Sequence, residues 1–192
     1  MFFNRKKNRV QKADVKPYSE AKHVSYVKEF HKMQLDDAET YVSVDRNYIR
    51  PIKEAGLKIT DAMIDAVKGG INFKYVADEA SRSQQLSSVR KAPSTLQYIE
   101  NPTNTIIKAA IKNAHGVDFL KKGFYTNEKV WKFAVVHDPE LIRWCVDPTI
   151  EELALAIYCD EKYLWVAGDR KDEVMDYILN NDMTYMKNRF SI

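Results

Sequence analysis

The sequence predicts an all-α fold, in which about six to seven short helix hairpins form a solenoid-like stack with an N-terminal helical cap. The main observation is a small residue followed by an aliphatic one, a pair that recurs along the chain. Its copies are Ser43-Val44, Ala66-Val67, Ser88-Val89, Ala110-Ile111, Ala134-Val135, Ala156-Ile157 and, more loosely, Tyr177-Ile178. The aliphatic members are 23, 22, 22, 24, 22 and 21 residues apart. Such a period is typical of repeat proteins, which present broad surfaces rather than deep catalytic clefts.

The second observation is a set of helix signals inside one repeat, residues 101–120. Asn101 can accept hydrogen bonds from a first helical turn, and Pro102 suits the first helical position. The aliphatic residues that follow share one helical face; they are Ile106, Ile107, Ala110 and Ile111. A break and a shorter apolar element come next. Because a hairpin this short cannot bury its own apolar face, its neighbours have to cover it.

The same plan predicts the other elements and both ends of the chain. Further helix starts are expected at Asp147-Pro148, Asp138-Pro139 and Ala92-Pro93. Aromatic residues in phase with the aliphatic pairs are expected in the core rather than in a base-stacking ladder; they are Tyr75, Tyr98, Phe119, Trp144, Trp165 and Tyr185. A separate helix within residues 17–40 forms the N-terminal cap, with Val24, Val27, Phe30 and Met33. The C-terminal end is closed by Met183, Tyr185, Met186 and Phe190.

Composition and charge suggest a domain plan. Residues 1–16 carry six basic residues against one acidic residue, and residues 138–182 carry twelve acidic residues against four basic ones. We expect residues 1–16 to be a flexible basic arm and residues 17–192 to be a single helical repeat domain. No apolar run approaches the roughly 18 residues that span a bilayer. Two isolated cysteines, Cys145 and Cys159, fit a reducing compartment, so we expect a cytoplasmic protein without a membrane anchor.

No catalytic or cofactor-binding pattern stands out. The four histidines are His23, His31, His115 and His137. They lack metal-ligand spacing, and His115 and His137 are expected to terminate helices. Cys145 near His137-Asp138 is expected to be buried and unreactive. Gly69-Gly70 is a loop without a phosphate-binding motif. We therefore expect no enzyme activity, no cofactor and no metal.

Two regions are candidates for partner binding. Trp131 lies out of phase with the other aromatic residues, so we expect it to be exposed, as an interface hot spot would be. The basic arm offers two apolar and four basic side chains: Phe2, Phe3, Arg5, Lys6, Lys7 and Arg9. The arm could contact phosphates, or it could fold onto an acidic partner with the phenylalanines as anchors.

The stretch Tyr98-Ile99-Glu100-Asn101-Pro102-Thr103, with residues 106–113 after it, resembles the short helical repeats of uncharacterised bacterial and bacteriophage proteins. The resemblance is best between residues 60 and 170 and is lost at residues 79–85, where a polar run replaces the Asn-Pro start. It implies a repeat fold and an accessory or host-directed role, which for a phage protein would lie in the host cytoplasm. It supplies no catalytic residue.

Three functions follow in order of preference. The first is a non-enzymatic helical repeat that binds another macromolecule, most readily a protein. The second is nucleic-acid binding through the basic arm and the positive middle region. The third is an enzyme whose site is assembled from loops, for which no nucleophile, base and orienting residue can be named.

Overall fold

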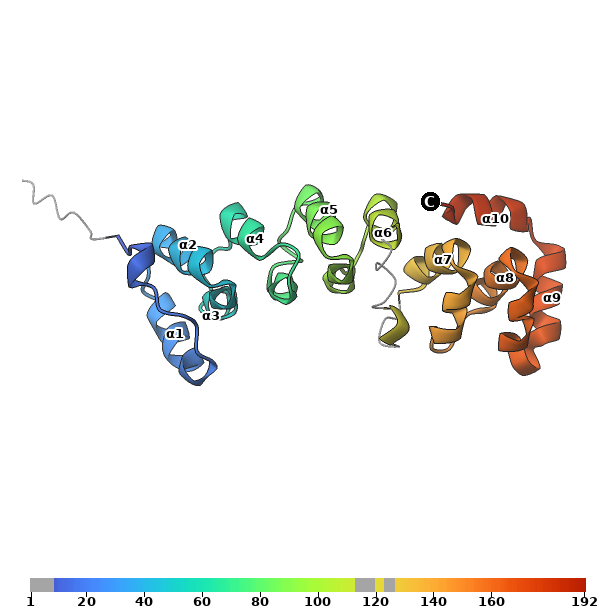
Figure 1. The fold of residues 1–192 in the computed structure, drawn as a ribbon, viewed down its shortest axis with the longest axis horizontal. Coiled ribbons are helices and arrows are strands. Elements are labelled where there is room, and N and C mark those ends of the chain that lie inside the picture. The colour runs from blue at the N-terminus through green and yellow to red at the C-terminus, as the bar shows by residue number, and fades with distance from the viewer. Residues whose placement is uncertain (1–8, 113–119, 123–126) are drawn as a thin grey trace, which may run out of the picture. The chain divides into compact units, whose positions relative to one another are not determined.

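The computed structural model describes residues 9–112, 120–122 and 127–192. These residues form α-helices and 3-10 helices without any β-strand, which confirms the predicted all-α class (Figure 1). The chain divides into two compact units. The N-terminal unit comprises Met1–Lys91 with Tyr98–Glu100, and the C-terminal unit comprises Ala92–Gln97 with Asn101–Ile192. The prediction of one domain over residues 17–192 stays a prediction.

The N-terminal unit has two rows of helices. Its elements are η1 (Lys12–Asp14), η2 (Glu20–Lys22), α1 (His23–Phe30), α2 (Leu35–Val44), η3 (Arg46–Tyr48), α3 (Ile49–Glu54), α4 (Asp61–Val67), η4 (Ile71–Tyr75) and α5 (Arg82–Lys91). In Figure 1, α2, α4 and α5 form one row and α3 lies below it. Helix α2 packs against α4, and α3 packs against both α1 and η4.

The C-terminal unit is built around α8. Its elements are α6 (Asn104–Ile111), η6 (Leu120–Lys122), α7 (Glu128–His137), η7 (Pro139–Trp144), α8 (Ile150–Cys159), η8 (Glu161–Arg170), α9 (Lys171–Asn180) and α10 (Met183–Phe190), and η5 (Pro93–Tyr98) is shared between the units. Helix α8 contacts α7, α9 and α10 and is buried without interruption from Glu152 to Ile157. A helix that is apolar on all sides is typical of the centre of a fold.

Four α-helices, α4, α5, α7 and α8, are each followed by a 3-10 helix, where the sequence predicts a longer helix and a shorter one in each hairpin. The 3-10 members are η4, η5, η7 and η8. Two of them begin after an aspartate whose side chain accepts a hydrogen bond from the N–H two residues later: Asp138 from Glu140 and Asp160 from Lys162. Asp138-Pro139 therefore starts a short element as predicted, with Pro139 at its first position.

The α-helices begin at regularly spaced caps. In six of them, a side-chain oxygen accepts a hydrogen bond from the N–H three residues later, and Asp182 does so for α10. The other five caps are spaced by 21 to 24 residues. These cap residues are Thr60, Ser81, Thr103, Asn127 and Thr149. The predicted starts at Asn101-Pro102 and Asp147-Pro148 are therefore wrong by two residues. The threonine after each proline is the cap, and Asp147 instead takes a left-handed turn with φ of 55°.

Five of the predicted aliphatic anchors are buried, namely Val67, Val89, Ile111, Val135 and Ile157. The first anchor is wrong: Val44 is 41% exposed, whereas Val42 is 1% exposed. The looser copy, Ile178, is half-buried. Val42 follows Gln34, the residue before α2, by the same interval as Val89 follows Ser81, the residue before α5.

The core position predicted for the aromatic series is wrong for Trp144, Trp165 and Tyr185, which are exposed. Tyr75 and Tyr98 are half-buried, and Phe119 lies outside the described residues. In each 3-10 helix, the buried residue lies two positions earlier; these residues are Phe73, Leu96, Ile142 and Tyr163. Because a 3-10 helix has three residues per turn, a shift of two positions turns a side chain to another face.

The ends of the chain are closed by aromatic contacts. Tyr48 is 1% exposed, and its ring contacts four others at centroid distances of 5.0 to 6.0 Å. Those rings belong to Tyr18, Tyr26, Phe30 and Tyr41. At the other end, Phe190 of α10 meets Phe133 edge-to-face with a centroid distance of 5.2 Å.

Candidate functional site

The described part of the basic arm contacts α2. Phe2, Phe3, Arg5, Lys6 and Lys7 lie outside the described residues. Arg9 is exposed and forms an ion pair with Asp36 of α2. The N–H of Val10 donates to Asp37 with an N···O distance of 2.9 Å, and Val15 is buried. These contacts with α2 are not predicted by the composition of the arm.

Trp131 is in the core of the C-terminal unit, so the expectation of an exposed tryptophan is wrong. The side chain is 2% exposed and is the largest of the buried side chains in the described part of the chain. Helix α7 packs against α6, α8 and α10, so more than one of its faces is covered. A residue of α7 that does not lie on the face predicted to be buried can therefore still be covered by a helix that packs on a different face.

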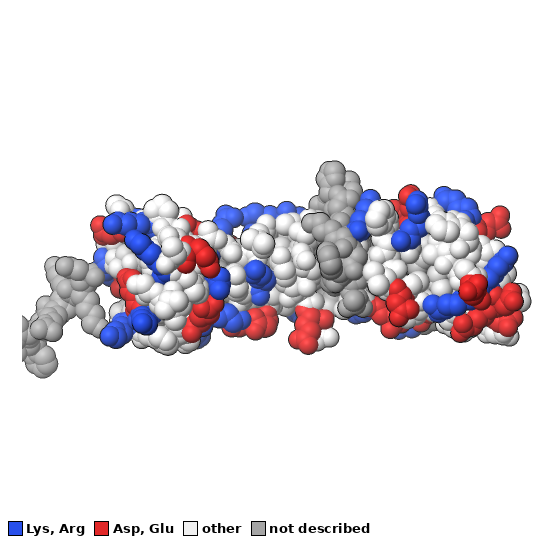
Figure 2. All heavy atoms as spheres, turned by 90° about the horizontal axis from the view of Figure 1, so that it is seen from below, with Lys and Arg blue, Asp and Glu red and all other residues white. Residues whose placement is uncertain are grey.

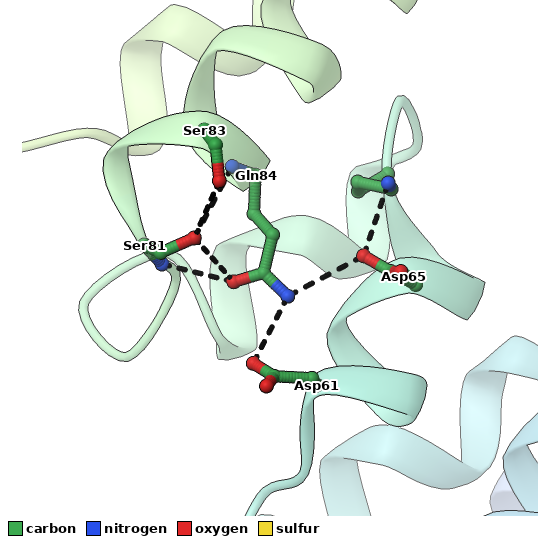
Figure 3. Close-up of a pocket in the computed structure, with 6 residues that line it drawn as sticks. Asp61, Asp65, Ser81, Ser83 and Gln84 are labelled. Atoms are coloured by element: carbon green, nitrogen blue, oxygen red, sulfur yellow. Dashed lines mark hydrogen bonds and ion pairs between the residues drawn. The ribbon is translucent and has the colours of Figure 1, made fainter.

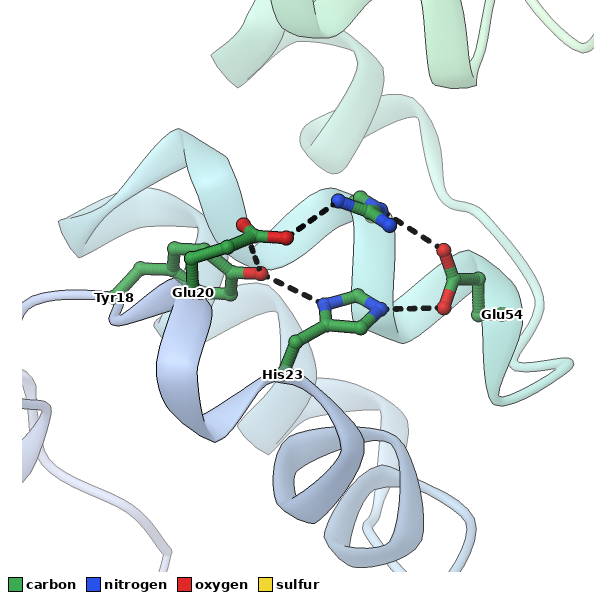
Figure 4. Close-up of polar contacts among 5 residues, drawn as sticks. Tyr18, Glu20, His23 and Glu54 are labelled. Atoms are coloured by element: carbon green, nitrogen blue, oxygen red, sulfur yellow. Dashed lines mark hydrogen bonds and ion pairs between the residues drawn. The ribbon is translucent and has the colours of Figure 1, made fainter.

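A polar network links the residues before α1 to α3, and it resembles a catalytic array at first sight (Figure 4). His23 Nδ1 lies 2.7 Å from the Tyr18 hydroxyl, and His23 Nε2 lies 2.5 Å from Glu54 Oε2. Arg50 Nε donates to the other oxygen of Glu54 over 3.0 Å. Tyr18 also lies 3.0 Å from Glu20 Oε2.

Proton counting shows what this network does. The Tyr18 hydroxyl has one proton, and when it donates to Glu20, His23 Nδ1 must donate to Tyr18. His23 Nε2 faces Glu54 Oε2, so the ring joins Tyr18 to Glu54. The bond from His23 holds the pKa of Glu54 below its ordinary range, whereas burial and the bond to Glu20 raise the pKa of Tyr18 to about 12. The network is a clamp between two segments, with no activated nucleophile.

A polar pocket of about 490 Å³ lies between α4 and α5 (Figure 3). The Gln84 Nε2 group donates to Asp61 and Asp65, and Gln84 Oε1 accepts from the N–H and the hydroxyl of Ser81. Lys68 pairs with Asp65 over 3.0 Å. Because the Gln84 amide uses both of its protons and both of its acceptor positions, it cross-links the two helices and leaves nothing for a ligand.

Cys145 does not have the surroundings of a nucleophile. Its Sγ lies 3.8 Å from Glu152 Oε2, and burial, followed by the charge of Glu152, raises the pKa of the thiol to about 12. The thiol therefore stays protonated at neutral pH, and only the thiolate is nucleophilic. Glu152 is 2% exposed and accepts the N–H of Thr149 over 2.8 Å, which makes it part of the α8 cap.

Exposed apolar side chains gather in the C-terminal unit. Ten large apolar side chains are exposed among the described residues, and three of them, Val24, Val44 and Ile71, belong to the N-terminal unit. The other seven belong to the C-terminal unit: Trp144, Val146, Tyr158, Trp165, Met175, Leu179 and Tyr185. Trp165 is 65% exposed, and the Arg143 guanidinium lies 5.7 Å from its ring centroid. Exposed tryptophan and arginine are the residue types most enriched at interface hot spots.

A groove of about 440 Å³, here called the α8–α9 groove, is lined by two of these exposed residues, Tyr158 and Met175. Its lining consists of Ile157 and Tyr158 of α8, Glu161 and Leu164 of η8, and Met175 and Ile178 of α9. The Tyr158 hydroxyl lies 2.8 Å from the Thr184 hydroxyl, so it is held at the wall. The remaining lining is mainly aliphatic, which favours apolar ligands.

The charge around the C-terminal unit is uneven. Figure 2 shows acidic side chains gathered along the lower edge of this unit, at the right, beside an area without charged side chains. Of the carboxylates near the α8–α9 groove, Asp160 pairs with Lys162 over 2.6 Å. Within the described ranges, no ion pair engages Glu161, Asp172 or Asp176. Their charge is therefore not neutralised by a neighbouring cation.

The sequence contained signals for this surface that repeat phase alone overlooks. Trp144 and Trp165, each two positions after a buried residue of a 3-10 helix, are exposed, whereas Tyr75 and Tyr98 at the same point are half-buried. On α9, Met175 and Leu179 are four residues apart and share one exposed face. The exposure of Trp144 and Trp165 reflects the 3-10 geometry of η7 and η8, whereas Met175 and Leu179 lie on the α-helix α9.

Three comparisons, with protein-family models, with curated proteins and with solved structures, find no match to this chain. In the residues that the structure covers, no helix has the length and apolar character needed to cross a bilayer. In the same residues, no group of three or more His, Cys, Asp or Glu side chains is placed to hold a metal ion.

Proposed function

We propose that the protein is a solenoid-like helical repeat that binds another protein through its C-terminal unit. The observation that carries this proposal is the concentration of exposed large apolar side chains in that unit, two of which, Tyr158 and Met175, line the α8–α9 groove. Contiguous exposed apolar surface on a soluble domain typically marks an interaction site. The regular caps from Thr60 to Thr149 support the stack, because each helix starts at a similar point of its repeat.

The two free cysteines and the raised pKa of both thiols support a reducing compartment, for which we propose the cytoplasm. Nucleic-acid binding has weaker support, since the one described basic residue of the arm's candidate set, Arg9, is paired with Asp36.

The proposal is tested by affinity purification of tagged protein from its own cells. Trp165→Ala with Trp144→Ala should lose a partner that the native chain retains, by about 30-fold or more in affinity if the pair acts as a hot spot. The control is Ile71→Ala with Val24→Ala, which removes two exposed apolar side chains from the N-terminal unit, each 67% exposed. Equal recovery of the same proteins by both variants would contradict the proposal.

A binding measurement at increasing salt concentration distinguishes nucleic-acid binding from protein binding. Phosphate contacts lose affinity steeply as salt rises. Binding of nucleic acid at low salt, with no protein partner that depends on Trp165, would favour the nucleic-acid function instead.

A further inference from the structure

We propose that the α8–α9 groove binds the apolar face of a basic amphipathic helix from another protein. This inference rests on the protein-binding function above and names the chemistry of the partner. Two properties of the groove carry it: its mainly aliphatic lining, and nearby carboxylates that form no ion pair among the described residues.

The lining selects a helix over an extended peptide. An extended peptide needs partners for its backbone N–H and C=O groups, which a strand edge supplies in β-addition. The described residues contain no β-strand, and the lining is mainly aliphatic, with Ile157, Leu164 and Ile178 in it. A helix satisfies its own backbone and needs only an apolar surface, so it fits this lining.

The exposed face of α9 extends the apolar surface beyond the groove. Met175 is 37% exposed and lines the groove, and Leu179 is 77% exposed one turn further on. Residues four apart on a helix lie on the same side. The two side chains therefore form a continuous contact for the apolar positions of a helical partner, which recur with the same spacing.

The rim selects a basic partner. Glu161 lines the groove, and Asp172 and Asp176 lie on α9 beside Met175 and Leu179. Both aspartates are exposed. Lys171 at the start of α9 is the one cation next to them on this helix, so the rim keeps an excess of negative charge. A partner with lysine or arginine at the edges of its apolar face would complement this rim, and acidic residues there would be repelled.

The test uses two synthetic peptides of about 18 residues, long enough to form a helix. Both have leucines along one face; one has lysines at the flanking positions and the other has glutamates. Fluorescence anisotropy measures affinity, and methyl NMR signals of Met175 and Ile178 report the site. We expect the lysine peptide to bind about tenfold tighter or more and to shift both signals, with affinity falling as salt rises.

Charge reversal on α9 sharpens the test. Asp172→Lys with Asp176→Lys should reduce the preference for the lysine peptide to less than about threefold, since both exposed carboxylates become cations. The control Glu100→Lys reverses an exposed carboxylate of the N-terminal unit and should leave the preference intact. Circular dichroism checks that both variants keep their helices.

Several results would overturn the inference. These are equal binding of the two peptides, no binding of either, or binding without a change at Met175 and Ile178. A synthetic peptide with the sequence of this chain's own residues 1–16 tests another occupant. If it binds tightly, the groove binds a second copy of this chain and not a separate protein. If the lysine peptide does not bind but a cellular partner still depends on Trp165, the groove proposal is wrong and the proposed protein-binding function stands. If neither is found, the proposed function fails as well.

Discussion

Polar side chains link successive helical segments in the N-terminal unit, whereas the surface around α9 in the C-terminal unit leaves apolar side chains and carboxylates exposed. In the N-terminal unit, Lys53 pairs with Asp78 over 2.9 Å and Asn72 donates to Asn47 over 3.0 Å. The C-terminal unit has its own link, in which Lys132 lies 2.5 Å from Glu151. Beyond that link, the surface around α9 has a different character.

This difference distinguishes residues that hold the repeats together from residues that are available to a partner. Burial alone would lower the pKa of Lys132, but its bonds to Glu128 and Glu151 raise it above its usual range, so the ion pair is part of the fold. Trp165 has no such structural role, because it is largely exposed. Changes to this exposed surface should therefore affect the proposed partner binding more than stability.

The largest effect that tests this comparison is expected from two tryptophans of the same unit. Trp131→Ala should lower the free energy of unfolding by about 3–5 kcal/mol, because it leaves a large cavity in the core. Trp165→Ala should change it by less than about 0.5 kcal/mol. Denaturant titration measures both.

Amide hydrogen exchange shows which helices lose stability in the Trp131→Ala variant. Protection should fall in α7 and α8 and stay unchanged in α2 and α4 if the two units unfold separately. A loss of stability for Trp165→Ala equal to that for Trp131→Ala would show that the exposed surface is structural, which would remove the contrast between the two regions.

The sequence predicted some features and missed others for physical reasons. The burial of Val89, Ile111 and Val135 follows from the period, because helices that pack in register need an aliphatic residue at the same point of each repeat. Trp131 was missed because α7 is covered on several sides, which its own pattern does not reveal. In the candidate site, the acidic character near α9 was visible as a charge block, but the outward position of Trp165 depends on 3-10 geometry.

The sequence alone also does not predict which side chains hydrogen-bond between segments that are far apart in the chain. Gln84 bonds to Asp61 across 23 positions of sequence, and nothing local specifies that pair. The caps at Thr103 and Thr149 were missed because asparagine, aspartate and threonine all suit a helix start. For Thr149, however, the glutamate three residues later was a capping-box signal in the sequence itself.

An intermediate effect on stability is expected when the threonine that caps a helix is replaced in each unit. Thr60→Ala should cost about 1 kcal/mol, as for an ordinary cap. Thr149→Ala should cost about 1–2 kcal/mol, because Thr149 is half of a reciprocal capping box with Glu152. Thermal unfolding measures both changes, and Thr149→Ser, which keeps the hydroxyl, should restore most of the loss. Equal effects of the two alanine variants would mean that the reciprocal bond from Glu152 adds nothing.

The smallest effect concerns the clamp of the N-terminal unit and its pH dependence. The pKa of Glu54 is lowered below its ordinary value near 4.5, first by the bond from His23 and then by that from Arg50. The folded state therefore binds the Glu54 proton more weakly than the unfolded state does. The stabilisation is fully present above the ordinary pKa and is lost as the pH falls through the lower folded pKa.

Because Glu54 is 45% exposed, the stabilisation should be less than about 1 kcal/mol. Glu54→Gln should remove this part of the acid sensitivity, so that the stabilities of the two chains converge as the pH falls below about 4.5. Denaturant titrations at a series of pH values measure the difference. Glu39→Gln, in the same unit but outside the clamp, should not change the slope. A constant difference between Glu54→Gln and the native chain at every pH would show that the clamp acts through its shape and not through the charge on Glu54.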